Sequence, residues 1–212
     1  MSAPLPGPGL YLITPDPWTE ALPGRLASAL AAGVKLVQYR SKSGSDAECA
    51  ARAAALRVEC RKAGVPLIVN DDPLLAREVG ADGVHVGRDD TRLAEAHRVL
   101  GPGAIVGCSC YDSLERALRA EDEGASYVAF GSFFPSPTKP RATPARLELL
   151  AGARARISIP VVAIGGITPD NARSLVDAGA RWLAVVSAVF AAPDPARAVE
   201  RFAAAFQSTG NP

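Results

Sequence analysis

Short apolar runs that end in polar clusters recur along the whole chain, and this recurrence constrains its fold more than any other feature. Leu67–Val69 leads into Asn70-Asp71-Asp72, and Val84–Val86 leads into Gly87-Arg88-Asp89-Asp90. Runs without polar alternation are typical of parallel strands that are covered on both faces. The pattern predicts eight such strands, at about residues 10–13, 34–39, 66–70, 83–87, 104–109, 127–134, 160–165 and 182–187.

Alanine-rich amphipathic stretches separate these strands, and most of them end in glycine. Leu26–Gly33 precedes the run at Val34, and Asn171–Gly179 precedes the run at Leu183. Glycine just past a helix readily adopts the left-handed conformation of a C-cap. Strands that alternate with helices in this way predict an α/β fold, a single (β/α)8 TIM barrel over residues 1–212, with residues 1–8 as a flexible N-terminal segment. A doubly wound open sheet, which needs fewer strands, is the alternative.

The overall composition favours one compact domain without a strongly charged surface. A net charge of +1 excludes the basic field of a nucleic-acid binder, and 48% apolar residues suffice for a large core. No apolar run reaches the roughly 20 residues that span a bilayer, and the N-terminus lacks the features of a signal peptide. We therefore expect a cytoplasmic protein that binds neither nucleic acid nor membranes, and its oligomeric state stays open.

The cysteines and histidines form no catalytic or metal-binding pattern in the sequence. The spacing of the cysteines matches neither a zinc site nor a redox pair, so we expect buried free thiols at Cys49, Cys60, Cys108 and Cys110. His85 lies between two valines of a predicted strand and is expected to line the barrel. His97 is expected on the surface or packing face of a helix. No Ser/His/Asp or Cys/His arrangement follows from these positions.

A polar segment at residues 38–42 combines an amide with two cations. Gln38, Arg40 and Lys42 alternate along the chain, so on an extended segment their side chains share one face. An amide and two cations on one face suit an anionic, hydrogen-bonding ligand such as a diphosphate ester. An exposed strand end with ordinary charges would show the same pattern, and this alternative stays open.

Two aspartates follow neighbouring predicted strands. Asp71 and Asp90 end the third and the fourth strand, so their carboxylates would lie close together and repel each other without a cation between them. Mg²⁺ prefers such oxygen ligands and also binds substrate phosphates. Asp72 and Asp89 stay open as additional ligands, although Asp72 directly before Pro73 also fits a helix N-cap.

Later segments favour anion binding. Gly165-Gly166 ends a predicted strand, with Thr168 as the N-cap of the next helix and Pro169 in its first turn. Backbone amides beside a helix N-terminus bind anions, and the loops after strands seven and eight commonly form the phosphate site of a barrel. Ser187 would close this site from the eighth strand. A proline-rich loop at residues 134–140 adds two hydroxyls and a lysine that could bind an anion. A solvated loop without a binding role is the alternative interpretation of this segment.

A series of segments also occurs in a characteristic order: Gln38-Tyr39-Arg40-Ser41-Lys42, Val69-Asn70-Asp71, Gly83-Val84-His85-Val86-Gly87, Asp90, Gly107-Cys108-Ser109, residues 131–139, Ala163-Ile164-Gly165-Gly166-Ile167 and Val186-Ser187-Ala188. Taken together, from Leu10 to Phe206, these segments resemble the thiamine phosphate synthase family in order and spacing. Each motif alone is weak, because strand-plus-glycine phosphate sites occur in many barrels. The whole series is specific.

The resemblance implies a transferase that joins 4-amino-5-hydroxymethyl-2-methylpyrimidine diphosphate to a thiazole phosphate and releases diphosphate. It implies that the pyrimidine diphosphate is bound by Gln38, Tyr39, Arg40, Ser41, Lys42, Asn70, Ser109 and Lys139. It implies Mg²⁺ as the cofactor on Asp71 and Asp90, and a thiazole phosphate bound by Ser136, Pro137, Thr138, Gly166, Val186 and Ser187. Charge in a dissociative reaction would be stabilised by Arg40, Lys42 and Lys139.

Two departures from the family pattern concern affinity more than reaction type. Arg88 stands where glutamine is common in the family, close to Asp90. Ser136-Pro137-Thr138 replaces the more usual Thr-Ser-Thr, which removes one hydroxyl and one backbone donor. Neither change touches a proposed metal ligand, so we expect the reaction type to be kept.

Three rival functions stay open. A thiazole tautomerase resembles the synthase, but in that group a histidine closely follows the fifth-strand serine and the metal aspartates are not kept. Here Ser109 is followed by Cys110-Tyr111-Asp112. A Schiff-base aldolase would need a desolvated Lys42 or Lys139, which borohydride trapping would reveal. A non-catalytic barrel would bind the thiazole phosphate without any Mg²⁺-dependent product.

Overall fold

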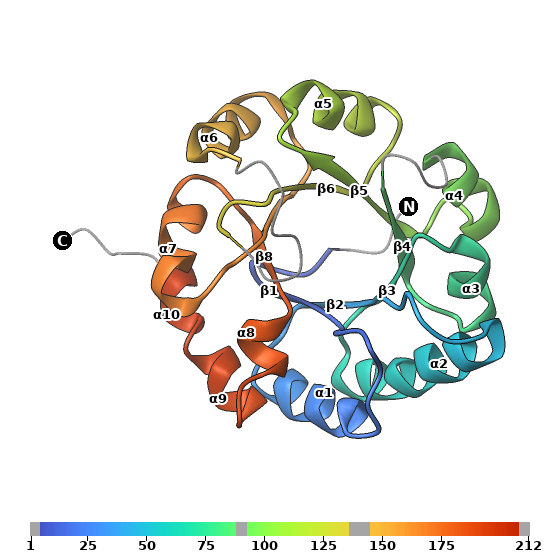
Figure 1. Ribbon diagram of the computed structural model, residues 1–212. Helices are drawn as coiled ribbons and strands as arrows, with labels where there is room; N and C mark the ends of the chain where they lie inside the picture. Colours follow the sequence, from blue (N-terminus) through green and yellow to red (C-terminus); the bar gives the residue numbers. More distant parts are fainter. Residues whose placement is uncertain (1–4, 88–92, 136–144, 208–212) are drawn as a thin grey trace.

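The computed structural model describes residues 5–87, 93–135 and 145–207, and Figure 1 shows them as a closed barrel of strands inside a ring of helices. The strands of these residues run parallel in chain order, and β1 also pairs with β8. They are β1 Gly9–Ile13, β2 Leu36–Tyr39, β3 Leu67–Asn70, β4 Gly83–Val86, β5 Ile105–Tyr111, β6 Tyr127–Phe130, β7 Val161–Ile164 and β8 Trp182–Val185. The predicted (β/α)8 TIM barrel is confirmed, and the pairing of β1 with β8 excludes the open sheet.

Helices cover the outside of the barrel and connect successive strands (Figure 1). In the described ranges they are α1 Leu22–Ala31, α2 Asp46–Ala63, α3 Pro73–Glu78, α4 Leu93–Leu100, α5 Leu114–Asp122, α6 Leu147–Arg156, α7 Pro169–Asp177, α8 Ser187–Phe190, α9 Pro195–Glu200 and α10 Ala203–Phe206. Among the residues described, the structure contains no helix with the length and apolar character of a membrane span.

Local signals set the ends of the helices. Ser45 is the N-cap of α2: its hydroxyl accepts from the Glu48 N–H, and the Glu48 carboxylate accepts from the Ser45 N–H at 2.7 Å. Gly64 ends this helix with a φ of +66°, in the left-handed conformation that glycine adopts readily. Asp72 caps α3 by accepting from the Leu75 N–H at 2.9 Å, so its predicted role as an N-cap is confirmed.

Two predicted strands extend well beyond the observed ones. The sixth was expected to reach residue 134 but ends at Phe130, and the loop that follows binds the end of β7 through the Phe134 N–H and the Gly165 carbonyl, 3.1 Å apart. The eighth was expected to reach residue 187 but ends at Val185, because Ser187 already begins α8. In both places apolar residues continue past the strand and pack from a loop or a helix, so apolar character does not mark where strand pairing stops.

Side chains alternate along each strand between the barrel interior and the layer of helices. The interior core contains Tyr11, Ile13, Leu36, Ile68, Ile105, Tyr127, Ala129, Val162, Trp182 and Ala184. The larger core fills the space between barrel and helices, and it takes the alternate strand positions such as Val37 and Tyr39. The place of a residue along its strand therefore decides whether its side chain faces the barrel interior.

The amino-terminal segment packs at the base of the barrel, where the strands begin. Trp182 Nε1 donates to the Gly7 carbonyl at 2.9 Å, and Arg181 Nη2 donates to the Pro6 carbonyl at 3.1 Å. Leu5 packs against the interior core. Residues 5–7 of the segment predicted to be flexible are thus held by specific contacts, while residues 1–4 lie outside the described part of the chain.

All four cysteines are free thiols, as predicted. Cys60 and Cys110 are buried, and burial raises the pKa of the Cys60 thiol to about 12. Cys49 and Cys108 are only half-buried, so the prediction of burial is wrong for these two. Cys49 lies in the first turn of α2 beside an exposed loop, with its thiol 3.8 Å from the Ser43 carbonyl oxygen. The spacing of the cysteines along the chain does not predict such partial burial.

Candidate functional site

The carboxyl ends of the parallel strands meet at one mouth of the barrel (Figure 1), and those predicted polar residues that the structure describes follow or end these strands. Gln38 and Asn70 occupy inward-facing positions, because each stands two residues after an interior core residue, Leu36 on β2 and Ile68 on β3. Ser109 on β5 lies in register with an interior residue of β6. The fold therefore brings three of the predicted site residues to the inner wall of the mouth.

A buried set of hydrogen bonds, which we call the interior network, connects two of these residues. Gln38 Nε2 donates to the Tyr11 hydroxyl at 2.7 Å, and the hydroxyls of Tyr11 and Tyr127 lie 2.7 Å apart. His85 Nδ1 lies 3.0 Å from the Tyr127 hydroxyl, and His85 Nε2 lies 2.8 Å from Ser109 Oγ. Burial raises the pKa of both phenols, so both stay neutral. His85 lines the barrel as predicted, whereas the sequence analysis missed the two tyrosines.

Tyr39 takes the opposite face of β2 from Gln38. Its side chain is 3% exposed and packs in the core between barrel and helices. Burial raises the pKa of its hydroxyl to about 12. The side chain of Tyr39 thus stays away from the inner wall of the mouth. Ser41 is half-buried on the loop after β2, and its hydroxyl donates to the Ser43 carbonyl at 2.8 Å.

Arg40 and Lys42 lie on the loop after β2, because the strand ends at Tyr39 and the chain bends at Lys42. The expectation of one extended face shared with Gln38 is therefore corrected: the alternation is interrupted where strand pairing ends. Thr14 fixes the backbone of Arg40 from the neighbouring loop. Its buried hydroxyl accepts from the Arg40 N–H at 2.9 Å and donates to the Arg40 carbonyl at 3.2 Å.

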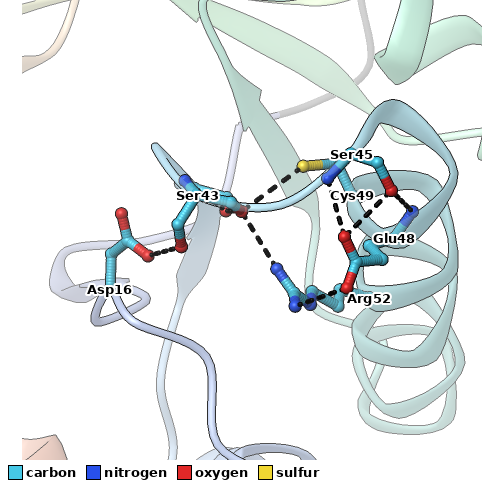
Figure 2. A network of polar contacts seen from close by, with 7 residues as sticks. Asp16, Ser43, Ser45, Glu48, Cys49 and Arg52 are labelled. Carbon is cyan, nitrogen blue, oxygen red and sulfur yellow. Dashed lines mark hydrogen bonds and ion pairs between the residues drawn. The ribbon is translucent and has the colours of Figure 1, made fainter.

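Asp16 joins the loop after β1 to the loop after β2. Its carboxylate accepts from the Lys42 N–H at 2.8 Å and from the Ser43 hydroxyl at 2.6 Å. Figure 2 shows Ser43 between Asp16 and Arg52 of α2, and Arg52 donates to the Ser43 carbonyl at 3.0 Å. The Ser43 hydroxyl, the Lys42 N–H and nearby guanidinium groups lower the pKa of Asp16. The charged carboxylate therefore holds the loop that carries the predicted cations.

Asp71 stands directly after β3 in a left-handed backbone conformation. Its φ is +66°, which is uncommon for a residue other than glycine and is often found at functional sites. Its N–H donates to the His85 carbonyl at 2.8 Å, and its carboxylate accepts from the Asn70 side-chain amide. A carboxylate at this place offers the oxygen ligands that Mg²⁺ prefers. Asp72, by contrast, uses one carboxylate oxygen to cap α3.

Several predicted site residues lie outside the described part of the chain. They are Asp90 and its neighbour Asp89, together with Ser136, Pro137, Thr138 and Lys139. Within residues 5–87, 93–135 and 145–207, no group of three or more acidic, histidine or cysteine side chains could hold a metal ion. In the sequence, residues 88–92 and 136–144 come after the carboxyl ends of β4 and β6, since Gly87 follows β4 and Pro135 follows β6.

The loop from β7 to α7 is built around two glycines with left-handed backbone. Gly165 has a φ of +104° and Gly166 a φ of +61°. A side chain at Gly165 would overlap Ser132 Oγ, and one at Gly166 would overlap the Pro135 carbonyl oxygen. The close approach of the loop after β6 therefore requires glycine at both positions. Asn171 of α7 fixes the loop by donating to the Gly166 carbonyl at 3.1 Å.

Helix starts follow the ends of both β7 and β8. Thr168 is the N-cap of α7 and Pro169 its first residue, as predicted, and the Thr168 N–H donates to Asn171 Oδ1 at 2.9 Å. Val186 is half-buried against the interior core. Ser187 is exposed and begins α8, so its predicted place on the eighth strand is wrong, because the chain turns into a helix directly after Val186. Both loops face the same mouth as the strand ends.

Comparison with known proteins identifies close relatives over nearly the whole chain. Residues 10–189 match the sequence model of a family described as thiamine monophosphate synthase. The thiamine-phosphate synthase of Methylococcus capsulatus is 54% identical over 209 residues, which cover 98% of this chain and 93% of the relative. That of Thiobacillus denitrificans is 57% identical over 191 residues, 90% of each chain. The thiamine phosphate pyrophosphorylase structure from Pyrococcus furiosus is 36% identical with a TM-score of 0.83, covering 93% of this chain and 94% of that one.

Proposed function

Because the chain belongs to the thiamine monophosphate synthase family and is therefore a transferase of thiamine biosynthesis, we propose that it is a thiamine phosphate synthase. It would join 4-amino-5-hydroxymethyl-2-methylpyrimidine diphosphate to a thiazole phosphate and release diphosphate. The observation that carries the proposal is the presence of two kinds of binding region at one mouth. Inward-facing Gln38, Asn70 and Ser109 lie on β2, β3 and β5, and the loop at Gly165-Gly166 follows β7. Two regions at one mouth suit a reaction that joins two phosphorylated substrates.

The pyrimidine diphosphate is assigned to the β2–β5 side of the mouth. Its proposed contacts are Gln38, Tyr39, Arg40, Ser41, Lys42, Asn70 and Ser109, with Lys139 from outside the described residues. The side-chain amides suit the hydrogen-bonding edge of an aminopyrimidine, and the two cations of the β2–α2 loop suit a diphosphate. Because the Tyr39 side chain packs in the outer core, its contribution would come from its backbone.

Mg²⁺ is the proposed cofactor, with Asp71 and Asp90 as its protein ligands. The Asp71 carboxylate at the end of β3 and its left-handed backbone support this assignment. When bound, Mg²⁺ would neutralise the negative charge of the diphosphate oxygens. Asp72 has one carboxylate oxygen engaged by the Leu75 N–H, so it is the weaker choice as an additional ligand.

The thiazole phosphate is assigned to the loops after β6, β7 and β8. Its proposed contacts are Ser136, Pro137, Thr138, Gly166, Val186 and Ser187. The left-handed glycines support the assignment, because they expose backbone groups without side chains, and the start of α8 adds further N–H groups close by. A phosphate site from the loops after strands seven and eight, together with a short extra helix, is common in such barrels.

In the proposed reaction, the bond between the pyrimidine methylene carbon and the diphosphate oxygen breaks before the new bond forms. The electron pair leaves with the diphosphate, and the electron-rich aminopyrimidine stabilises the positive methylene carbon. Arg40, Lys42 and Lys139 would stabilise the departing negative charge. The thiazole nitrogen then attacks the methylene carbon, and the loops of the mouth orient it and exclude water.

The proposal includes a cytoplasmic location and a single domain, with the two substrates as small-molecule partners. The net charge of +1 supports the absence of nucleic acid among the partners. Assembly into a homo-oligomer stays open.

The test mixes the purified protein with the pyrimidine diphosphate and the thiazole phosphate, with and without Mg²⁺, and detects thiamine phosphate by mass spectrometry. We expect product only when both substrates and Mg²⁺ are present. Product in the presence of a chelator would contradict the metal assignment. No product, with the thiazole phosphate bound or isomerised, would move the assignment to a phosphate binder or a thiazole tautomerase.

A further inference from the structure

The interior network runs from the middle of the barrel to its mouth. Gln38, Tyr11, Tyr127 and His85 are at most 7% exposed, whereas Ser109 is half-buried and lies at the inner wall of the mouth. Each consecutive pair lies between 2.7 and 3.0 Å apart, within the range of good hydrogen bonds. Gln38 and Ser109 are the two members at the mouth, and a buried network of this kind controls the orientation of the groups at its ends.

The surrounding aromatic rings hold the network in place. Gly107 of β5 lies in register with both His85 of β4 and Tyr127 of β6, and a side chain at Gly107 would overlap the Tyr127 ring. The imidazole stacks on this ring, with the centroids 5.6 Å apart and the planes at 26°. Tyr11 and Trp182 meet the same ring edge-on, at 5.8 and 5.7 Å. The Tyr127 hydroxyl and the imidazole are therefore confined to one relative orientation.

One direction of donors and acceptors gives every proton of the network an acceptor. The amide nitrogen of Gln38 can only donate, so the Tyr11 oxygen accepts its hydrogen bond. In this direction Tyr11 donates to the Tyr127 oxygen and Tyr127 donates to His85 Nδ1, whereas the reverse direction would leave the buried Tyr11 proton without an acceptor. An accepting Nδ1 leaves the imidazole proton on Nε2, which donates to Ser109 Oγ. The hydroxyl proton of Ser109 is thereby directed away from the network.

We propose that His85 is a positioning residue: the interior network holds its imidazole proton on Nε2 and so makes the Ser109 hydroxyl a hydrogen-bond donor to the ligand. For a pyrimidine ligand the acceptor is a ring nitrogen, and in this respect the inference rests on the proposed function. The opposite direction of the network would place the imidazole proton on Nδ1. Ser109 would then accept a hydrogen bond, which matches the exocyclic amino group instead.

NMR of the full-length protein without substrate tests the tautomer directly. The chain has two histidines, and the His97→Gln variant removes the second, whose Nε2 lies 3.0 Å from the Gly124 carbonyl oxygen, outside the network. Long-range ¹H–¹⁵N spectra of this variant should show an unprotonated Nδ1 and a protonated Nε2 for His85. Adding Tyr127→Phe should shift both nitrogens toward averaged values, because Nδ1 loses its donor. A protonated Nδ1, or spectra unchanged by Tyr127→Phe, would overturn the proposal.

Two substitutions of His85 separate positioning from packing. His85→Gln can present an amide N–H near the place of Nε2, whereas the shorter side chain of His85→Asn ends near Nδ1 and cannot reach Ser109. We expect His85→Gln to keep the KM for the pyrimidine diphosphate within about threefold, and His85→Asn to raise it about tenfold, the effect of one lost hydrogen bond. The KM for the thiazole phosphate should stay unchanged. Equal losses in the two variants, or equal changes in the two KM values, would contradict a positioning role.

Ser126→Ala is the matched control, because it removes a hydrogen bond between β5 and the residue before β6, outside the network. Ser126 Oγ accepts from the Val106 N–H at 3.0 Å. We expect unchanged His85 spectra and an unchanged KM for the pyrimidine diphosphate. A tenfold rise in this KM would show that the His85→Asn effect is a general loss of structure. If the wild type makes no thiamine phosphate, the proposed function fails, whereas the spectra without substrate still decide the tautomer.

Discussion

The two sides of the barrel mouth present ligand-binding groups in different ways. On the β2–β5 side, Gln38, Asn70 and Ser109 are strand side chains held by hydrogen bonds or interior packing. On the β7–β8 side, Gly165 and Gly166 supply backbone groups. A fixed side chain distinguishes a donor from an acceptor, whereas backbone N–H groups bind any suitably placed anion. For the proposed substrates, the comparison predicts that specificity comes from the β2–β5 side and phosphate affinity from the β7–β8 side.

On the β7–β8 side of the mouth, we expect the largest effect from a substitution at Gly166. The Gly166→Ala variant forces a Cβ into a φ of +61° and against the Pro135 carbonyl oxygen. We expect the free energy of unfolding to fall by about 3 kcal/mol, of which about 1 kcal/mol is left-handed backbone strain and about 2 kcal/mol is overlap. Urea unfolding measures this change, and thiazole phosphate binding should weaken with it.

Gly24 of α1 provides the control for a glycine substitution, since a side chain there meets nothing within 4 Å. Gly24→Ala should raise the free energy of unfolding by up to about 1 kcal/mol, because alanine favours the helix. A loss of stability in this variant as large as in Gly166→Ala would show that the geometry of the β7–α7 loop is not the cause.

On the β2–β5 side of the mouth, Asp71→Asn removes one negative charge at the proposed metal site. We expect kcat/KM to fall about 100-fold, or about 2.7 kcal/mol, and the activity to need more Mg²⁺. The free energy of unfolding should change by less than about 1 kcal/mol, because asparagine also adopts the left-handed conformation. Steady-state kinetics at several Mg²⁺ concentrations, together with urea unfolding, separate the two effects.

Asp72→Asn is the neighbouring control, since asparagine also caps helices. We expect its kcat/KM to stay within about threefold of the wild-type value, a change of less than about 0.7 kcal/mol. An equal, 100-fold loss in both variants would mean that Asp72 belongs to the metal site as well.

Thr14→Val tests the β2–β5 side of the mouth, because it removes the hydroxyl that holds the loop after β2 and leaves the side-chain volume nearly unchanged. The variant leaves the N–H and the carbonyl of Arg40 without the buried hydroxyl that binds both. We expect the free energy of unfolding to fall by about 1.5 kcal/mol, and kcat/KM to fall about fivefold because Arg40 loses its position. Thr14→Ser keeps the hydroxyl and should restore activity. Lost stability with unchanged kcat/KM would separate Thr14 from the site.

Asp16→Asn should have the smallest effect, and one that depends on pH. The Ser43 hydroxyl, above all, lowers the pKa of Asp16 below its ordinary value of 3.8. Such a carboxyl stabilises the folded state above its unfolded pKa, and the stabilisation is lost as the pH falls through the folded pKa. We expect wild type and variant to differ by less than about 1 kcal/mol at neutral pH, as exposed charged contacts do. Urea unfolding should show this difference vanishing below about pH 4; a constant difference at every pH would contradict the charge effect.

The barrel and the position of polar segments at its mouth follow from the sequence alone. Eight apolar runs that alternate with helices leave few arrangements, because strands covered on both faces must be apolar and parallel strands need crossover helices. Segments such as Asn70-Asp71 and Gly165-Gly166 follow these runs directly, so their place at the carboxyl ends was predictable. A tyrosine in an otherwise apolar run, such as Tyr11, was a further local signal of the interior network, but it did not tell where the hydroxyl points.

Which side chains contact one another, by contrast, depends on how the whole chain packs. Tyr39 and Gln38 are neighbours in the sequence, yet the pleat of β2 sends one to the helix layer and the other into the barrel. The hydroxyls of Tyr11 and Tyr127 are 2.7 Å apart although 116 positions separate them in the chain. Such contacts depend on the register between strands, which is set by the packing of the whole barrel. The register cannot be predicted from a short segment of the sequence, because each contact joins side chains of two strands that are far apart in the chain.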